Sequence, residues 1–255
     1  MTVPSLTRTS VAVSLVLGAL LTALSILTMP DFTGDNAASL QAIADSSVAT
    51  LSSLSWIASQ LFLAVGTLGV MHLLRHRVPV LATLAGGLLL VGVFGHTVHG
   101  GVQLMMLQMA RDPGAVQTHA ATLDGLYSHP AALPFLAAGL VGVVLGHLVL
   151  AAAVWRAGTG PRWLAPALVL FVLSEFLLNG LAPWVGSAAG VLFVLAYVGL
   201  AVVVRRSSIA HWETTADASA RPDDDAARGL VVQAAGVGVH DEGRDEEAQQ
   251  QGPQR

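Results

Sequence analysis

Residues 80–106 read VLATLAGGLLLVGVFGHTVHGGVQLMM, a run without a single charged side chain. At a rise of about 1.5 Å per residue, a helix of this length crosses the roughly 30 Å hydrocarbon core of a bilayer. His96, His99 and Gln103 recur at helical spacing, so a helix presents them as one polar stripe on a surface that otherwise suits lipid. The stretch therefore predicts a membrane-spanning helix with a functional face.

The composition of the whole chain agrees with a membrane protein. Hydrophobic residues make up 54% of the 255 residues and charged residues 11%, whereas about a quarter of the residues in soluble domains are charged. The charges lie in short stretches between apolar runs, which favours a single all-α transmembrane bundle. The chain has no cysteine, which excludes disulfides, thiolate metal sites and thiol catalysis.

The apolar runs predict the path of the chain through the membrane. We expect six spans within a domain of residues 1–206, at residues 11–29, 54–74, 80–106, 131–155, 163–181 and 184–204. The first run follows a basic start, as a signal peptide does, but its length and the lack of an Ala-x-Ala site favour retention. Residues 207–255 are acidic with few aromatics, which predicts a disordered cytoplasmic tail.

The arginines predict the orientation of the bundle in a cell membrane. On a six-span path one side carries Arg8, Arg75, Arg77, Arg156, Arg162, Arg205 and Arg206. Arginine gathers on the cytoplasmic side of membrane proteins, so both termini are expected there. The opposite side holds an acidic segment at residues 31–52, with a short surface helix over 37–51, and a polar loop at 111–128.

Several polar residues are expected to meet in the outer half of the bilayer. Counting the helical rise from the cytoplasmic edge places Glu175 at about 18 Å, Gln60 at about 20 Å, and His96 and Asn179 at about 24 Å. The same count leaves His147 at about 10 Å, apart from this group. His99 and Gln103 come out nearer the external surface, so these residues together predict a polar cavity that opens outward and narrows toward Glu175.

Two interpretations of the candidate site stay open. Glu175 is the only acidic residue within an apolar run, and intramembrane ionisable groups mark ion and substrate pathways, which predicts a proton or cation site. Alternatively, hydrogen bonds from Asn179, Gln60 or His96 make Glu175 a group that fixes helix packing. The complete set of candidate residues is Gln60, His96, His99, Gln103, Glu175 and Asn179.

Metal and cofactor chemistry have weaker support in the sequence. A His-x-x-His pair at His96 and His99 lacks the further ligands that zinc requires, so no metal site is predicted. A haem held between two histidines needs both at similar depth on facing helices, which leaves only His99 with His129 as a possible pair. No cofactor is predicted. Trp56, Trp155, Trp163 and Trp184 lie near predicted helix ends, where tryptophan anchors a helix at the membrane interface.

The layout resembles that of a loose group of bacterial six-helix membrane proteins. The resemblance rests on a first helix ending at Met29-Pro30, an acidic external segment, Trp56 near the start of the second helix, and a basic turn from Arg75 to Pro79. It covers mainly the first hundred residues and implies the topology alone, because the group brings no activity to this chain.

No stretch carries a catalytic or phosphate-binding motif, so we expect a protein without enzymatic activity. The leading hypothesis is a membrane protein that binds or passes a small ligand or a proton through the cavity. The alternatives are a structural membrane protein whose tail binds a protein partner, and a haem-dependent redox protein. The bilayer is the expected environment, and no nucleic-acid partner is predicted.

Overall fold

The computed structural model describes residues 3–30, 32, 34–178, 181–182 and 184–212. These residues form α-helices and two short 3₁₀ turns, with no strand among them. The helices are α1 Val3–Thr28, α2 Asn36–Asp45, α3 Ala49–Leu74, α4 Pro79–Met109, α5 Val116–Ser128, α6 Leu133–Ala157, α7 Leu164–Phe176 and α8 Trp184–Arg206, and the turns are η1 Pro113–Ala115 and η2 Ile209–Trp212. The predicted all-helical class is confirmed for this part of the chain. Most of the predicted tail, residues 213–255, lies outside the described residues.

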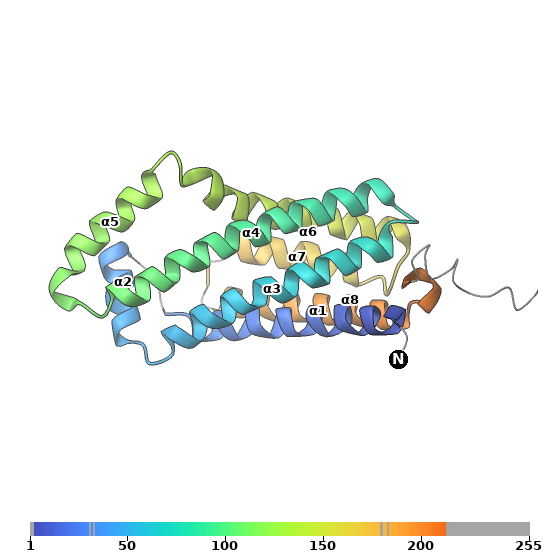
Figure 1. Ribbon diagram of the computed structural model, residues 1–255, viewed down its shortest axis with the longest axis horizontal. Coiled ribbons are helices and arrows are strands. Elements are labelled where there is room, and N and C mark those ends of the chain that lie inside the picture. The colour runs from blue at the N-terminus through green and yellow to red at the C-terminus, as the bar shows by residue number, and fades with distance from the viewer. Residues whose placement is uncertain (1–2, 31, 33, 179–180, 183, 213–255) are drawn as a thin grey trace, which may run out of the picture. The chain divides into compact units, whose positions relative to one another are not determined.

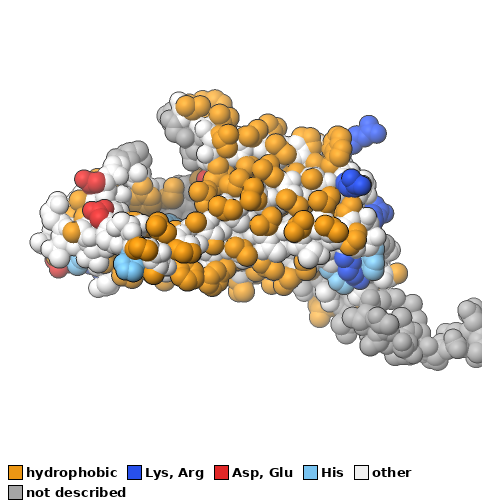
Figure 2. Space-filling model, turned by 90° about the horizontal axis from the view of Figure 1, so that it is seen from above, with side chains coloured by type: hydrophobic (Ala, Val, Ile, Leu, Met, Phe, Trp, Pro, Cys, Tyr) orange, Lys and Arg blue, Asp and Glu red, His pale blue; other side chains and the backbone are white. Residues whose placement is uncertain are grey.

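Five of these helices, α1, α3, α4, α6 and α8, are long and apolar enough to cross a membrane. Their outward faces carry large apolar side chains, such as Leu61, Val80 and Val191, which are each more than half exposed. Figure 2 shows hydrophobic side chains covering the flank of the bundle. This surface fits a membrane protein, because a lipid environment removes the cost of exposing apolar side chains.

The predicted span 163–181 corresponds to α7, which has only 13 residues and so a length of about 20 Å. The sequence after it contains Asn179-Gly180 and Pro183, which are residues that interrupt helices. This helix is too short to cross a bilayer alone, and the sixth span stays a prediction.

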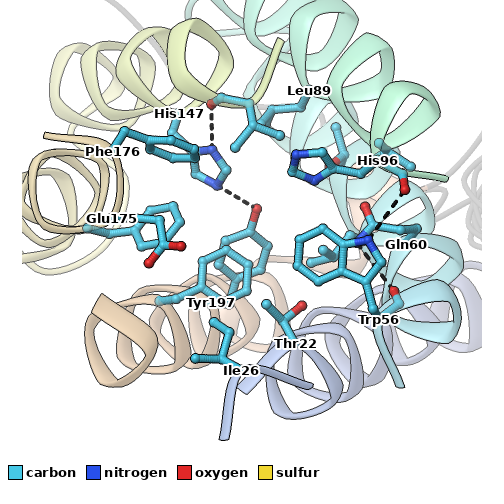
Figure 3. A pocket seen from close by; sticks show the side chains of 16 residues that line it. Thr22, Ile26, Trp56, Gln60, Leu89, His96, His147, Glu175, Phe176 and Tyr197 are labelled. Carbon is cyan, nitrogen blue, oxygen red and sulfur yellow. Dashed lines mark hydrogen bonds between the residues drawn. The ribbon is translucent and has the colours of Figure 1, made fainter. Parts of the chain in front are cut away.

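The six helices α1, α3, α4, α6, α7 and α8 close into a ring. Around the ring, α1 packs on α3 and α8, α4 packs on α3 and α6, and α7 packs on α6 and α8. Short connections such as the turn at 75–78 make consecutive helices antiparallel neighbours. The ring places one face of every helix around a common centre, seen in Figure 3.

The crossing between α4 and α6 is the closest contact in the ring, and it is made by glycines. A side chain on Gly142 would place its Cβ 2.7 Å from the Gly92 Cα, and one on Gly95 would collide with the backbone of Gly139. Small residues at matching positions let helix backbones approach each other. Gly139 and Gly142 of α6 therefore pack directly against Gly95 and Gly92 of α4.

The C-terminal part of α4 runs beyond the ring to a small separate core with α2 and α5 (Figure 1). This core contains Leu40, Ile43, Ala49, Met106, Ala110 and Leu123. The Asn36 Nδ2 donates to the Asp124 Oδ1 at 2.7 Å and links α2 to α5. We refer to α2, α5 and the end of α4 as the cap.

Two predictions about the outer segments need correction. Residues 116–128 were expected in a polar loop but form α5, because Val116, Ala120, Leu123 and Tyr127 recur at helical spacing and face α2. The surface helix expected over 37–51 ends at Asp45, and the residues from Ala49 onward belong to α3. The Asp35 Oδ1 accepts from the Ala38 N at 2.8 Å and caps α2 at its N-terminus.

The start of α1 and the end of α8 meet at the end of the ring opposite the cap. The Arg8 Nη1 donates to the Ser207 carbonyl oxygen at 2.7 Å, and the Arg205 Nη1 donates to the Thr9 Oγ1 at 2.7 Å. Trp212 is buried there and stacks on His72 with ring centroids 5.2 Å apart. The packed part of the chain thus continues to Trp212, beyond the predicted boundary at residue 206. We call this the arginine end; Figure 2 shows basic side chains gathered here and acidic ones near the opposite end.

Candidate functional site

The centre of the ring holds a cavity of about 140 Å³ that side chains from all six ring helices line. Most of these side chains are apolar or aromatic, with a few polar groups among them (Figure 3). The lining consists of Thr22, Ile26, Trp56, Gln60, Leu63, Thr67, Leu89, Val93, His96, Val143, His147, Phe171, Glu175, Phe176, Phe193 and Tyr197. A concave, largely apolar site with a few polar groups is the usual form of a small-molecule site.

Glu175 is the only acidic side chain in this lining. It lies in the last turn of α7, and its Oε2 is buried without a hydrogen-bond partner among the described residues. Asn179, which the sequence suggests as a partner, lies outside the described residues. A buried carboxyl oxygen without a donor is costly, so this atom is the group in the cavity that gains most from a bound donor or cation.

Trp56, Gln60 and His96 lie across the cavity from Glu175. The Trp56 Nε1 donates to the His96 carbonyl oxygen at 3.3 Å, and the two rings are 4.9 Å apart. The Gln60 Nε2 donates to the Ser59 Oγ at 3.1 Å and, at 3.4 Å, to the Trp56 carbonyl oxygen. Figure 3 shows these side chains on one wall and Glu175 on the other. The structure thus brings Gln60, His96 and Glu175 to one cavity, where Gln60 points its amide hydrogens at its own helix.

His99 and Gln103 do not line the cavity. They lie on the same stripe of α4 as His96, but α4 has by then passed the ring and entered the cap. The His99 ring lies 6.5 Å from the ring of Tyr127 in α5. Burial raises the pKa of the Tyr127 hydroxyl above its ordinary value. The polar stripe is therefore divided: His96 lines the cavity, and His99 and Gln103 lie on the cap side of it.

His147 and Tyr197 line the cavity, although sequence reasoning placed the first elsewhere and overlooked the second. The His147 Nδ1 lies 2.7 Å from the Val143 carbonyl oxygen, and its Nε2 lies 3.0 Å from the Tyr197 hydroxyl. The carbonyl can only accept, so Nδ1 carries a proton and the neutral ring accepts from Tyr197 at Nε2. The depth count failed because the cavity extends along the bundle axis and takes residues from several depths.

Trp56 also differs from the sequence expectation. The second helix was predicted to start at residue 54, which made Trp56 an interface anchor, but α3 starts at Ala49 and carries Trp56 into the bundle. Trp155, Trp163 and Trp184 are all about half exposed or more, as interface anchors are. The Trp56 hydrogen bond to the His96 carbonyl oxygen and the tilted contact between the two rings form the wall opposite Glu175.

The described residues contain no group of three or more histidine or acidic side chains that could hold a metal ion. Both ring nitrogens of His147 already make hydrogen bonds within the bundle. The His129 Nδ1, at the start of the connection into α6, accepts from the Ala131 N at 3.2 Å.

Comparison of the chain with known protein families, with curated proteins and with solved structures finds no match to any of them. The functional argument therefore rests on the geometry of the cavity.

Proposed function

We propose that this chain is a multi-pass membrane protein whose central cavity binds a small ligand or a proton at Glu175. The observation that carries the proposal is the buried Glu175 Oε2, which has no donor among the described residues and borders an empty space of about 140 Å³. Gln60 and His96 on the far wall offer the second polar contact. Intramembrane carboxyl groups placed at a cavity commonly mark a pathway.

In the proposed topology the protein lies in the cell membrane and crosses it six times. Both termini are in the cytoplasm. In this topology α7 belongs to the fifth span. Support comes from the charges, because the described arginines other than Arg111 lie on the segments of the arginine end, whereas Asp35, Asp45 and Asp124 lie on the cap. The cap would then face the outside, and the cavity is proposed to open toward it.

Aromatic and aliphatic side chains form most of the cavity wall, which sets the size and polarity of the proposed ligand. A space of about 140 Å³ holds a few water molecules or one small organic molecule. Glu175 would accept a hydrogen bond from such a ligand or hold the transported proton. We propose no enzymatic reaction for this cavity.

The test compares Glu175→Gln with the wild-type protein, both purified in detergent, by thermal unfolding across a pH series. A group whose pKa differs between the folded and the unfolded state makes the unfolding temperature depend on pH. We therefore expect a pH-dependent change in the wild type that Glu175→Gln lacks, and a loss of proton-dependent uptake or binding in liposomes.

A pair of glutamines supplies the matched control for this test. Gln60→Leu removes an amide from the cavity, whereas Gln103→Leu removes one from the cap side of α4. Ligand or proton signals should weaken in the first variant and persist in the second. Identical curves for wild type and Glu175→Gln, with unchanged uptake, would leave these polar groups with a packing role only.

The structural, partner-binding alternative is tested by removing the tail. Ser207 and Trp212 pack on the bundle, so the deletion should start after Trp212 and remove residues 213–255. Loss of activity in cells with the bundle still folded would favour a protein partner of the acidic tail over ligand binding in the cavity.

A further inference from the structure

A second, larger cavity of about 760 Å³ lies at the arginine end and shares no lining residue with the central cavity. Its walls are the turn between α3 and α4, the connection at 158–163 and the last turns of α8. We call it the interfacial groove. It is polar at one end and apolar along the rest of its length.

The polar end is built from two arginines that come from distant parts of the sequence. Arg77 and Arg206 both line the groove, and no acidic residue is among its described lining residues. The Arg77 Nη1 donates to the Ala157 carbonyl oxygen at 3.1 Å and to the Thr159 Oγ1 at 3.4 Å, which holds the guanidinium at the groove. These contacts use only part of its five N–H donors, and arginine suits phosphate geometry. This end of the groove therefore attracts an anion.

The apolar part of the groove follows α8 away from the arginines. Leu195 and Val202 line it and are 51% and 41% exposed. From Leu195 to Arg206 the helix rises about 16 Å, which is close to the depth of one leaflet of a bilayer core of about 30 Å. Gly199 lets the Trp163 ring lie against α8, because a Cβ there would come within 2.7 Å of the ring.

We propose that the interfacial groove binds one anionic glycerophospholipid, with its phosphate at Arg77 and Arg206 and an acyl chain along the α8 face toward Leu195. A zwitterionic lipid also carries a phosphate but brings a positive choline beside the two arginines, whereas an anionic lipid brings no such cation. A soluble phosphate would leave the apolar part uncovered. Basic pockets between membrane helices recognise anionic head groups in this way.

The test measures lipid retention by the full chain with native mass spectrometry. The protein is incubated in detergent with phosphatidylglycerol or with phosphatidylcholine of the same acyl chains. We expect one retained phosphatidylglycerol, preferred about twentyfold, because each arginine near an anionic group contributes to the attraction. The variant Arg77→Gln/Arg206→Gln should lower this ratio to near one.

Arg156→Gln is the matched control, since Arg156 is an exposed arginine of the same end that does not line the groove. If the double variant does not fold, Arg206→Gln alone replaces it and should lower the ratio severalfold. Equal retention of the two lipids by the wild type, or an equal loss in Arg156→Gln, would overturn the proposal.

A second pair of variants tests the apolar part of the groove. Val202→Trp fills it and should reduce phosphatidylglycerol retention, whereas Val191→Trp, at an exposed position of α8 outside the groove, should not. Soluble glycerol phosphate should fail to displace the lipid. Displacement by glycerol phosphate, or no effect of Val202→Trp, would instead make this a site for free phosphate and refute the lipid assignment.

Discussion

The hydrogen bond between His147 and Tyr197 is a buried side-chain contact of the cavity wall. Both side chains are 3% exposed. The His147 Nδ1 bonds to the Val143 carbonyl oxygen, and the Tyr197 hydroxyl bonds to the other ring nitrogen, Nε2. Buried polar groups of this kind are normally found with hydrogen-bond partners. The pair fixes the histidine ring at the cavity floor.

Removing the hydroxyl should therefore destabilise the bundle. Tyr197→Phe leaves the His147 Nε2 buried without a donor, and we expect a loss of about 1–2 kcal/mol in the free energy of unfolding. Unfolding of the detergent-purified protein measures this loss. Tyr127→Phe in the cap is the control and should have less effect, and equal losses in the two variants would contradict the assigned hydrogen bond.

At the level of elements, the α4–α6 crossing decides how wide the cavity is. Its glycines bring the two backbones together, and His96, Val143 and His147 reach the cavity from either side of this contact. A wider crossing would shift these groups relative to Glu175.

We expect Gly142→Ala to destabilise the bundle by about 1–3 kcal/mol, the usual cost of overpacking, because the added methyl group meets the Gly92 backbone. Thermal unfolding in detergent measures the change. Gly87→Ala on α4 is the control, since nothing lies within 4 Å of a Cβ there. The crossing would not be tight if both variants unfolded at the wild-type temperature.

The element level also shows where sequence reasoning failed. The apolar positions of α5 were present in the sequence, but its polar composition hid a helix that buries only Ala120 and Leu123 against another short helix. A helix of this kind gains its stability from a partner, and the partner, α2, lies far away in the chain. The sequence alone could not predict α5, because its stability depends on this tertiary contact.

For the whole molecule, the separation of charge predicts one orientation in the membrane. The chain contains no cysteine, so single cysteines can report the exposure of each end. Gly125→Cys in the cap should react with a membrane-impermeant maleimide in intact cells, and Ala210→Cys at the arginine end should react only after permeabilisation. The reverse pattern would show that the cap faces the cytoplasm.

The sequence by itself determined the helical class and the identity of Gln60, His96 and Glu175 as unusual polar groups, and of its six predicted spans five are helices of membrane length. These features follow from local composition, because a long apolar run can satisfy its backbone in lipid only as a helix, and any polar side chain within it is conspicuous. Only the tertiary structure decided that His147 and Tyr197 join the cavity, that His99 and Gln103 do not line it, and that Arg77 and Arg206 line one groove. Those relations depend on the order of the helices in the ring and on their axial offsets, which side-chain packing sets between segments that are far apart in the chain.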